Sequence, residues 1–115
     1  MQSDNLESFL NYCNSLRNVY IRWIADPDAS NNPMLEFTLG QFIRVCGDFL
    51  EMESFKAHAE RPACKLLQEL YEKIIEFDEI SYIDFKDPRW ITIQDLARKT
   101  EKALTTLIEE QRPHG

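Results

Sequence analysis

Apolar residues recur along the chain at intervals of three and four positions and seldom alternate with polar ones. The first spacing gathers side chains on one face of an α-helix, whereas strict alternation is typical of a β-strand. Only three glycines occur in 115 residues, so the sequence contains few residues that weaken the interior of a helix. The pattern therefore predicts an all-α fold.

Two helices are predicted in the first half of the chain, separated by the turn-forming stretch DPDASNNP. The first begins after Ser3 or Asp4 as N-cap and runs towards Ala25. The second begins at TLGQ, where Thr38 caps the helix and Gln41 can complete a capping box.

Two further helices are predicted in the second half. Pro62 suits the first turn of a helix that runs to about Phe77. The last helix begins with Thr92 as N-cap and ends near Gln111, before Pro113. The boundaries predict a single domain over residues 1–115, folded as an antiparallel bundle of about four helices.

Each predicted helix carries an apolar stripe that we expect to form the core. The stripes comprise Leu6, Phe9, Cys13, Leu16, Tyr20, Trp23 and Ile24; Leu39, Phe42, Ile43, Val45, Cys46, Phe49 and Leu50; Leu67, Leu70, Tyr71, Ile74 and Phe77; and Leu96, Ala103, Leu104, Leu107 and Ile108. Gly47 lies inside the second stripe, where a residue without a side chain weakens the helix but admits a close neighbour.

The charge of the chain indicates what kind of partner it attracts. Thirteen Lys and Arg against twenty Asp and Glu give a formal charge of −7. Such a charge repels phosphate backbones and anionic membrane surfaces and attracts basic proteins. We therefore expect neither nucleic acid nor a membrane as partner, and a basic protein instead.

Cysteine usage and the first residues of the chain favour a cytoplasmic protein. Cys13, Cys46 and Cys64 are odd in number and form no CxxC pair, which argues against a disulfide framework and a zinc knuckle. The opening MQSDNLESF lacks the basic and apolar regions of a signal peptide, and no stretch reaches the roughly 20 apolar residues of a transmembrane helix.

Four glutamates recur along the third predicted helix: Glu69, Glu72, Glu76 and Glu79. At 100° per residue they lie within an arc of about 80°, almost opposite the apolar stripe. This arrangement predicts a solvated or partner-binding acidic surface. A magnesium site, as in metal-dependent helical hydrolases, is disfavoured because Mg²⁺ requires oxygen ligands that converge from different elements.

No complete set of catalytic or metal-binding residues is found. His58, Glu60 and Cys64 lie close together in sequence but lack the further ligands of a zinc site, so a surface histidine is favoured. Cys13 and Cys46 fall on apolar stripes, where burial keeps a thiol protonated. Phosphate-binding glycine loops and nucleophile motifs are absent. We predict a protein that is not an enzyme and that has no metal and no cofactor.

The stretch DEISYIDFKDPRW, residues 78–90, breaks the helical period and combines rings with acids. Rings supply the buried contacts of an interface, and carboxylates form charge-assisted bonds to Arg and Lys. In the alternative, the rings of Tyr82, Phe85 and Trp90 fold back to cover the end of the bundle. The predicted partner-binding residues are Glu69, Glu72, Glu76, Asp78, Glu79, Tyr82, Asp84, Phe85 and Asp87.

A small, acidic, glycine-poor helical chain with the late segment SYIDF resembles the immunity proteins that bacteria keep against their own nuclease toxins, including those of colicins and contact-dependent growth inhibition systems. The resemblance implies a non-enzymatic cytoplasmic inhibitor that binds one basic toxin in a one-to-one complex and covers the nucleic-acid-binding surface of that toxin. A regulatory or adaptor module that binds another protein stays open, and so does the less favoured metal-dependent hydrolase.

Overall fold

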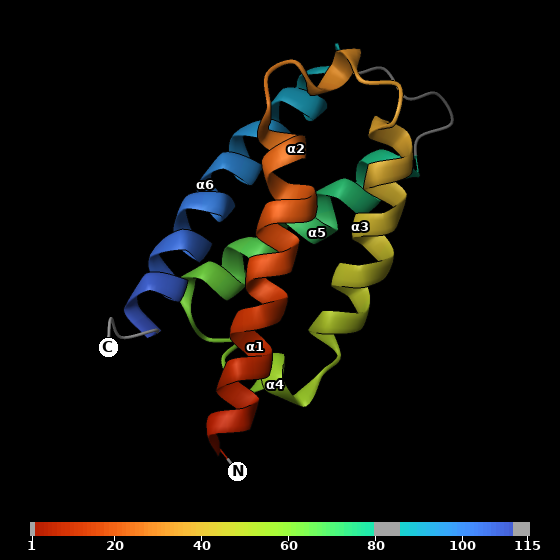
Figure 1. Ribbon diagram of the computed structural model, residues 1–115. Helices are drawn as coiled ribbons and strands as arrows, with labels where there is room; N and C mark the ends of the chain where they lie inside the picture. Colours follow the sequence, from red (N-terminus) through yellow and green to blue (C-terminus); the bar gives the residue numbers. More distant parts are fainter. Residues whose placement is uncertain (1, 80–85, 112–115) are drawn as a thin grey trace.

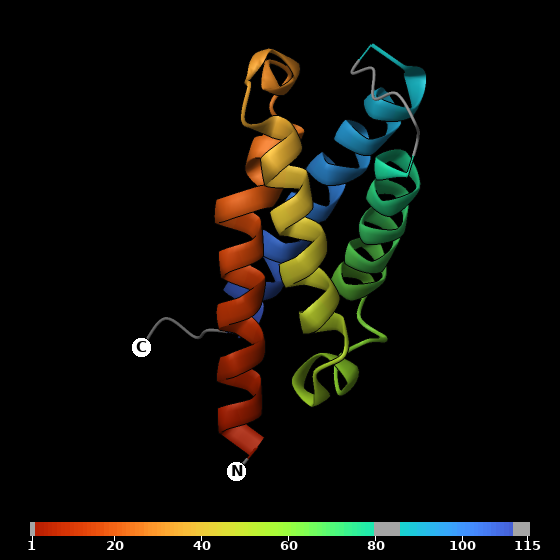
Figure 2. The ribbon, with the colours of Figure 1, turned by 90° about the vertical axis from the view of Figure 1, so that its right-hand side faces the viewer.

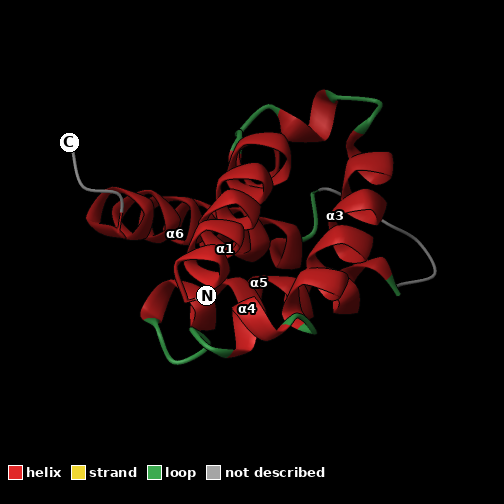
Figure 3. Ribbon diagram, turned by 60° about the horizontal axis from the view of Figure 1, so that its bottom comes forward, coloured by secondary structure: helices red, strands yellow, loops and turns green. Residues whose placement is uncertain are grey.

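A computed structural model describes residues 2–79 and 86–111, and every regular element in these ranges is helical, which confirms the predicted all-α class (Figure 3). The elements are α1 (Gln2–Leu16), the π-helical turn η1 (Arg17–Ile21), α2 (Arg22–Ala25), the 3-10 turn η2 (Ala29–Asn31), α3 (Leu35–Leu50), α4 (Glu53–Lys56), α5 (Pro62–Asp78) and α6 (Pro88–Gln111). No helix in the described part of the chain is long and apolar enough to cross a membrane.

The long helical segments alternate in direction, as Figures 1 and 2 show. α1, η1 and α2 rise from the N-terminus, α3 descends, α5 rises again and α6 descends towards the C-terminus. α6 packs against α1, η1 and α2 and also against α5, while α3 packs against α5 and α1. Figure 1 shows α5 and α6 crossing the other helices obliquely, so the arrangement departs from a bundle with nearly parallel axes.

The core is one cluster formed mostly by the predicted apolar stripes, and it also includes buried residues outside them, such as Leu10, Leu35 and Ile93. The Phe49 ring contacts three other rings, with its centroid 5.9 Å from that of Phe9, 5.1 Å from that of Tyr12 and 5.1 Å from that of Phe55. Phe55 belongs to the short helix α4, which was not predicted from the sequence, and its side chain is buried. Aromatic contacts between three helices therefore hold α4 against α1 and α3.

The π-helical turn corrects one part of the predicted core. The backbone N–H of Arg22 donates to the carbonyl oxygen of Arg17, five residues earlier, instead of the four of an α-helix. The additional residue in the turn rotates the following side chains about the helix axis. Ile21 and Ile24 consequently face the core, and Trp23, predicted to be buried, is 46% exposed.

Both threonines predicted to cap helices lie inside them instead. α3 begins at Leu35, and the Thr38 hydroxyl donates to the carbonyl of Met34. α6 begins at Pro88, and the Thr92 hydroxyl likewise donates to the carbonyl of Pro88. A threonine hydroxyl can bond to the preceding turn as well as cap a helix, and this competing geometry makes both cap predictions wrong.

A side chain caps the start of α6, whereas the N-cap residue of α3, Met34, forms no side-chain cap bond. Asn32 Oδ1 accepts the N–H of Met34 at 2.9 Å, just before α3. Asp87 is the residue just before α6, and its Oδ1 accepts the N–H of Arg89, in the first turn of the helix, at 2.8 Å. Asp87 thus supplies an acceptor to an N–H group in the first turn of α6, whereas Asn32 stabilises the turn that precedes α3.

Candidate protein-binding surface

The outer side of α5 carries the glutamates predicted from the sequence. Glu69, Glu72, Glu76 and Glu79 are all exposed, and we call these four residues the acidic face. They are exposed because Leu67, Leu70, Ile74 and Phe77, which lie on the other side of the helix, are buried in the core. Periodicity alone thus places the acidic face correctly.

Two lysines of α5 reduce the negative potential near the acidic face. Lys73 Nζ lies 3.6 Å from Glu76, and Lys65 Nζ lies 3.6 Å from Glu60. The side chains in both pairs are at least 48% exposed, so each pair contributes at most about 1 kcal/mol to stability. Solvated pairs of this kind exchange readily for contacts with the charges of a partner.

The remaining predicted acids differ from the acidic face. Asp78 is exposed at the C-terminal end of α5. Asp87 is half-buried and binds Arg89, with 2.7 Å between Arg89 Nη2 and Asp87 Oδ2. Side-chain and backbone hydrogen bonds from Arg89 lower the pKa of Asp87 to about 2. Asp87 therefore has an internal cation, which weakens its case as a partner contact.

The aromatic residues of the predicted site fall into two groups. Tyr82 and Phe85, together with Asp84, lie outside the described residues, and their partner-binding role stays a prediction. Trp90 is 1% exposed in α6, and its ring centroid lies 5.6 Å from that of Phe77 in α5. Of the two roles left open for Trp90, the structure supports the core.

The residues considered as zinc ligands are not arranged as a metal site. Cys64 is fully buried, and burial raises the pKa of its thiol to about 11. His58 stacks on Phe9 at 4.4 Å between ring centroids, and its Nδ1 accepts a hydrogen bond from Arg61 Nε at 3.1 Å. Across residues 2–79 and 86–111, no group of three or more His, Cys, Asp and Glu side chains could hold a metal ion.

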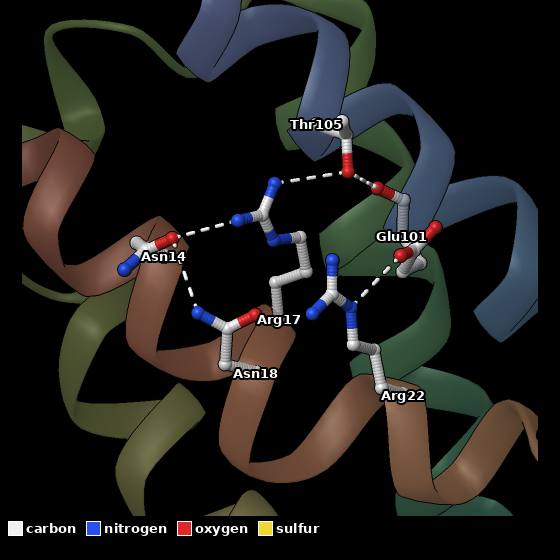
Figure 4. Close-up of polar contacts among 6 residues, drawn as sticks. All are labelled: Asn14, Arg17, Asn18, Arg22, Glu101 and Thr105. Atoms are coloured by element: carbon white, nitrogen blue, oxygen red, sulfur yellow. Dashed lines mark hydrogen bonds and ion pairs between the residues drawn. The ribbon is translucent and has the colours of Figure 1, made fainter.

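A polar contact between η1 and α6 was not predicted from the sequence (Figure 4). Arg17 donates from Nη1 to Thr105 Oγ1 at 2.9 Å and from Nη2 to Asn14 Oδ1 at 2.8 Å, whereas its buried Nε has no acceptor. On the solvent side, Arg22 Nε donates to Glu101 at 3.0 Å. The available signal was the position of Arg17, four residues after Cys13 and four before Ile21, which places a charge on an apolar stripe.

These observations define a small all-α protein with an exposed acidic face on one of its helices. The chain matches no protein-family model, no curated protein and no solved structure. Its function is therefore argued from its own charge, exposure and packing.

Proposed function

We propose that the protein is an immunity-type inhibitor that binds and neutralises a basic, nucleic-acid-cleaving toxin. The observation that carries the proposal is the acidic face, whose four glutamates are exposed along one side of α5 while the opposite side of that helix is buried in the core. A rigid helix that presents carboxylates outward is complementary to a surface of Arg and Lys. The overall charge of −7 acts in the same direction.

The inhibition would follow from competition for one surface. A toxin that cleaves nucleic acid binds phosphates through Lys and Arg, and carboxylates occupying those cations exclude the substrate. Charges accelerate association, but tight binding also requires buried side chains at the centre of the interface. Tyr82 and Phe85 are the rings that we propose for this role, with Asp84 as a bond acceptor for Arg or Lys.

Affinity purification of the tagged chain from its native host tests the proposal. We expect one basic protein in near-equal amount, whose nuclease activity is lost in the complex. Recovery of a non-basic protein, or of a basic protein whose activity is unchanged, would argue for a regulatory or adaptor module.

The role of the acidic face is tested with charge reversal in the recovered complex. Glu69→Lys with Glu72→Lys should slow association and flatten its dependence on salt. Glu109→Lys with Glu110→Lys is the matched control, because both glutamates are exposed on α6 and the change in net charge is the same. Equal effects of the two double variants would show that overall charge, and not the acidic face, guides the partner.

A further inference from the structure

A pocket of about 430 Å³ is lined by residues of α2, of η2 and its flanking turns, and of the start of α3. These elements lie at the upper end of the molecule in Figure 1. The lining of the pocket combines an aromatic ring, two carboxylates, an amide, an arginine and apolar side chains. The residues are Arg22, Trp23, Asp26, Asp28, Ala29, Asn32 and Leu35. Ala29 and Leu35 are buried, whereas Trp23, Asp26 and Asp28 are exposed, so the pocket has an apolar base and an aromatic and acidic opening.

The presence of Trp23 in this pocket results from the π-helical turn. Without the additional residue in η1, Trp23 would continue the apolar stripe of α1, and its indole would be available to the core. The protein instead leaves 46% of this side chain exposed, whereas its other tryptophan, Trp90, is 1% exposed. An exposed tryptophan beside a pocket is typical of a residue that binds a partner.

The backbone around the pocket is held from two sides. Gln94 of α6, which is buried, donates from Nε2 to the carbonyl of Asp26 at 2.7 Å and to that of Ile24 at 3.2 Å. The Asp26 carboxylate accepts the N–H of Asp28 at 2.9 Å. These bonds fix the end of α2 and the following turn, so little ordering is required when a ligand binds.

The charges of the pocket favour a cation. Neither Asp26 nor Asp28 forms an ion pair with another residue in the described ranges. Arg22, the cation in the lining, is already bound to Glu101 at 3.0 Å. Two carboxylates without a counter-ion therefore lie beside an exposed indole, whose face also attracts cations.

We propose that this pocket binds an arginine side chain of a partner protein, with the guanidinium stacked on Trp23 and hydrogen-bonded to Asp26 or Asp28. A guanidinium is planar and presents a fork of N–H donors, so it can stack on a ring and bind a carboxylate through two bonds at once. An ammonium is a compact charge that has neither the plane nor the fork. Met34 and Phe37, 51% and 59% exposed nearby in sequence, offer apolar area that a protein can cover. The inference rests on the proposed function in that a basic partner supplies the arginine.

Nuclear magnetic resonance with N-acetyl-arginine amide as probe tests the pocket without the partner. The chain has two tryptophans, so the buried Trp90 serves as an internal control for the exposed Trp23. We expect the indole N–H signal of Trp23 to shift saturably while that of Trp90 stays in place. Absence of a saturable Trp23 shift overturns the proposal, as does equal affinity for N-acetyl-lysine amide.

Matched variants separate the pocket from the overall charge. Asp26→Asn with Asp28→Asn keeps side chains that accept hydrogen bonds but removes both charges. This double variant should lower the affinity for the probe by about tenfold. Glu69→Gln with Glu72→Gln removes the same charge from the acidic face and should leave the affinity for the probe unchanged. Equal weakening by both pairs overturns the assignment, because it shows attraction to net charge alone.

Three further outcomes are distinguishable. A shift of the Trp23 signal with rising protein concentration and no probe would make a second copy the occupant and overturn the proposal. If the probe binds at Trp23 but no basic partner is recovered from the host, the pocket stands and the proposed inhibitor function fails. If a basic partner is recovered and binds Trp23→Leu as tightly as the unchanged protein, the pocket is not part of that interface.

Discussion

Gly47 of α3 makes room for the phenol of Tyr71 on α5. A Cβ placed on Gly47 would lie 2.8 Å from Tyr71 Oη, closer than unbonded atoms approach in proteins. Gly40, in the same helix, has no atom within 4 Å of the corresponding position. A close neighbour is expected at Gly47 from the sequence, and in the structure it is the hydroxyl of the half-buried Tyr71.

The two glycines should therefore respond differently to alanine. Gly40→Ala should raise the free energy of unfolding by about 1 kcal/mol, since alanine favours a helix more than glycine does. Gly47→Ala should not show this gain, because Tyr71 has to move, and should recover it in a Tyr71→Phe background that lacks the hydroxyl. Urea denaturation of Gly40→Ala, Gly47→Ala, Tyr71→Phe and the double variant Gly47→Ala with Tyr71→Phe measures the coupling energy between positions 47 and 71. The same effect of Gly47→Ala in both backgrounds would contradict the steric account.

Much of the fold could be predicted because it follows from periodicity. The buried positions of α3 and α5 repeat at the helical period, and Leu39, Phe42, Leu67 and Leu70 are buried as expected. The acidic face could be predicted for the same reason, as the complement of an apolar stripe. Helix starts were less predictable, because Thr38 and Thr92 can bond either to the N–H groups of a new turn or to the carbonyls of the previous one.

The features that sequence reasoning missed depend on contacts between distant segments. The π-helical turn and the resulting exposure of Trp23 have no local motif. Gln94 reaches the backbone of Asp26 across 68 positions in the sequence, and Arg17 reaches Thr105 across 88. Contacts at such separations are decided by how the helices pack, which a single sequence does not specify.

Arg17 should contribute to stability through its hydrogen bonds to α6 and α1. Arg17→Met keeps the length of the side chain but removes the donors to Thr105 and Asn14, and we expect a loss of about 1 to 2 kcal/mol. Arg22→Met is the matched control, since its bond to Glu101 is exposed and its removal should cost at most about 1 kcal/mol. Thermal and urea denaturation compare the two. Equal losses would show that the burial of Arg17 adds nothing.

His58 should make stability depend on pH. Burial and the neighbouring charge of Arg61 lower the pKa of His58 below its usual 6.5, so the unfolded chain takes up the proton first as pH falls. The stabilisation is therefore present above pH 6.5 and is lost as pH falls through the folded-state pKa. The stability difference between the unchanged protein and His58→Gln, measured across this range, should narrow on acidification. A stability difference that stays constant across this pH range would contradict the lowered pKa of His58.

The cysteines should be unreactive in the folded protein. Cys13, Cys46 and Cys64 are fully buried, and burial raises the pKa of Cys13 to about 12. The thiolate reacts with disulfide reagents, so few molecules are reactive at mildly alkaline pH. We expect labelling by a chromogenic disulfide to be slow without denaturant and complete for all three thiols in urea. Rapid reaction of one thiol in the folded protein would indicate local opening around it.

Alanine substitution of Trp90 and of Tyr82 or Phe85 should have opposite effects on stability and on partner binding. Trp90 is buried against Phe77, so Trp90→Ala should lower the free energy of unfolding by about 3 to 5 kcal/mol. If Tyr82 and Phe85 anchor the partner, Tyr82→Ala and Phe85→Ala should preserve stability and weaken the complex by about 2 kcal/mol or more, mainly through faster dissociation. Denaturation and binding kinetics with the recovered partner measure both effects. Loss of stability with normal binding by the folded variants would assign these two rings to the core, and the interface would then have to lie at the acidic face and at Trp23.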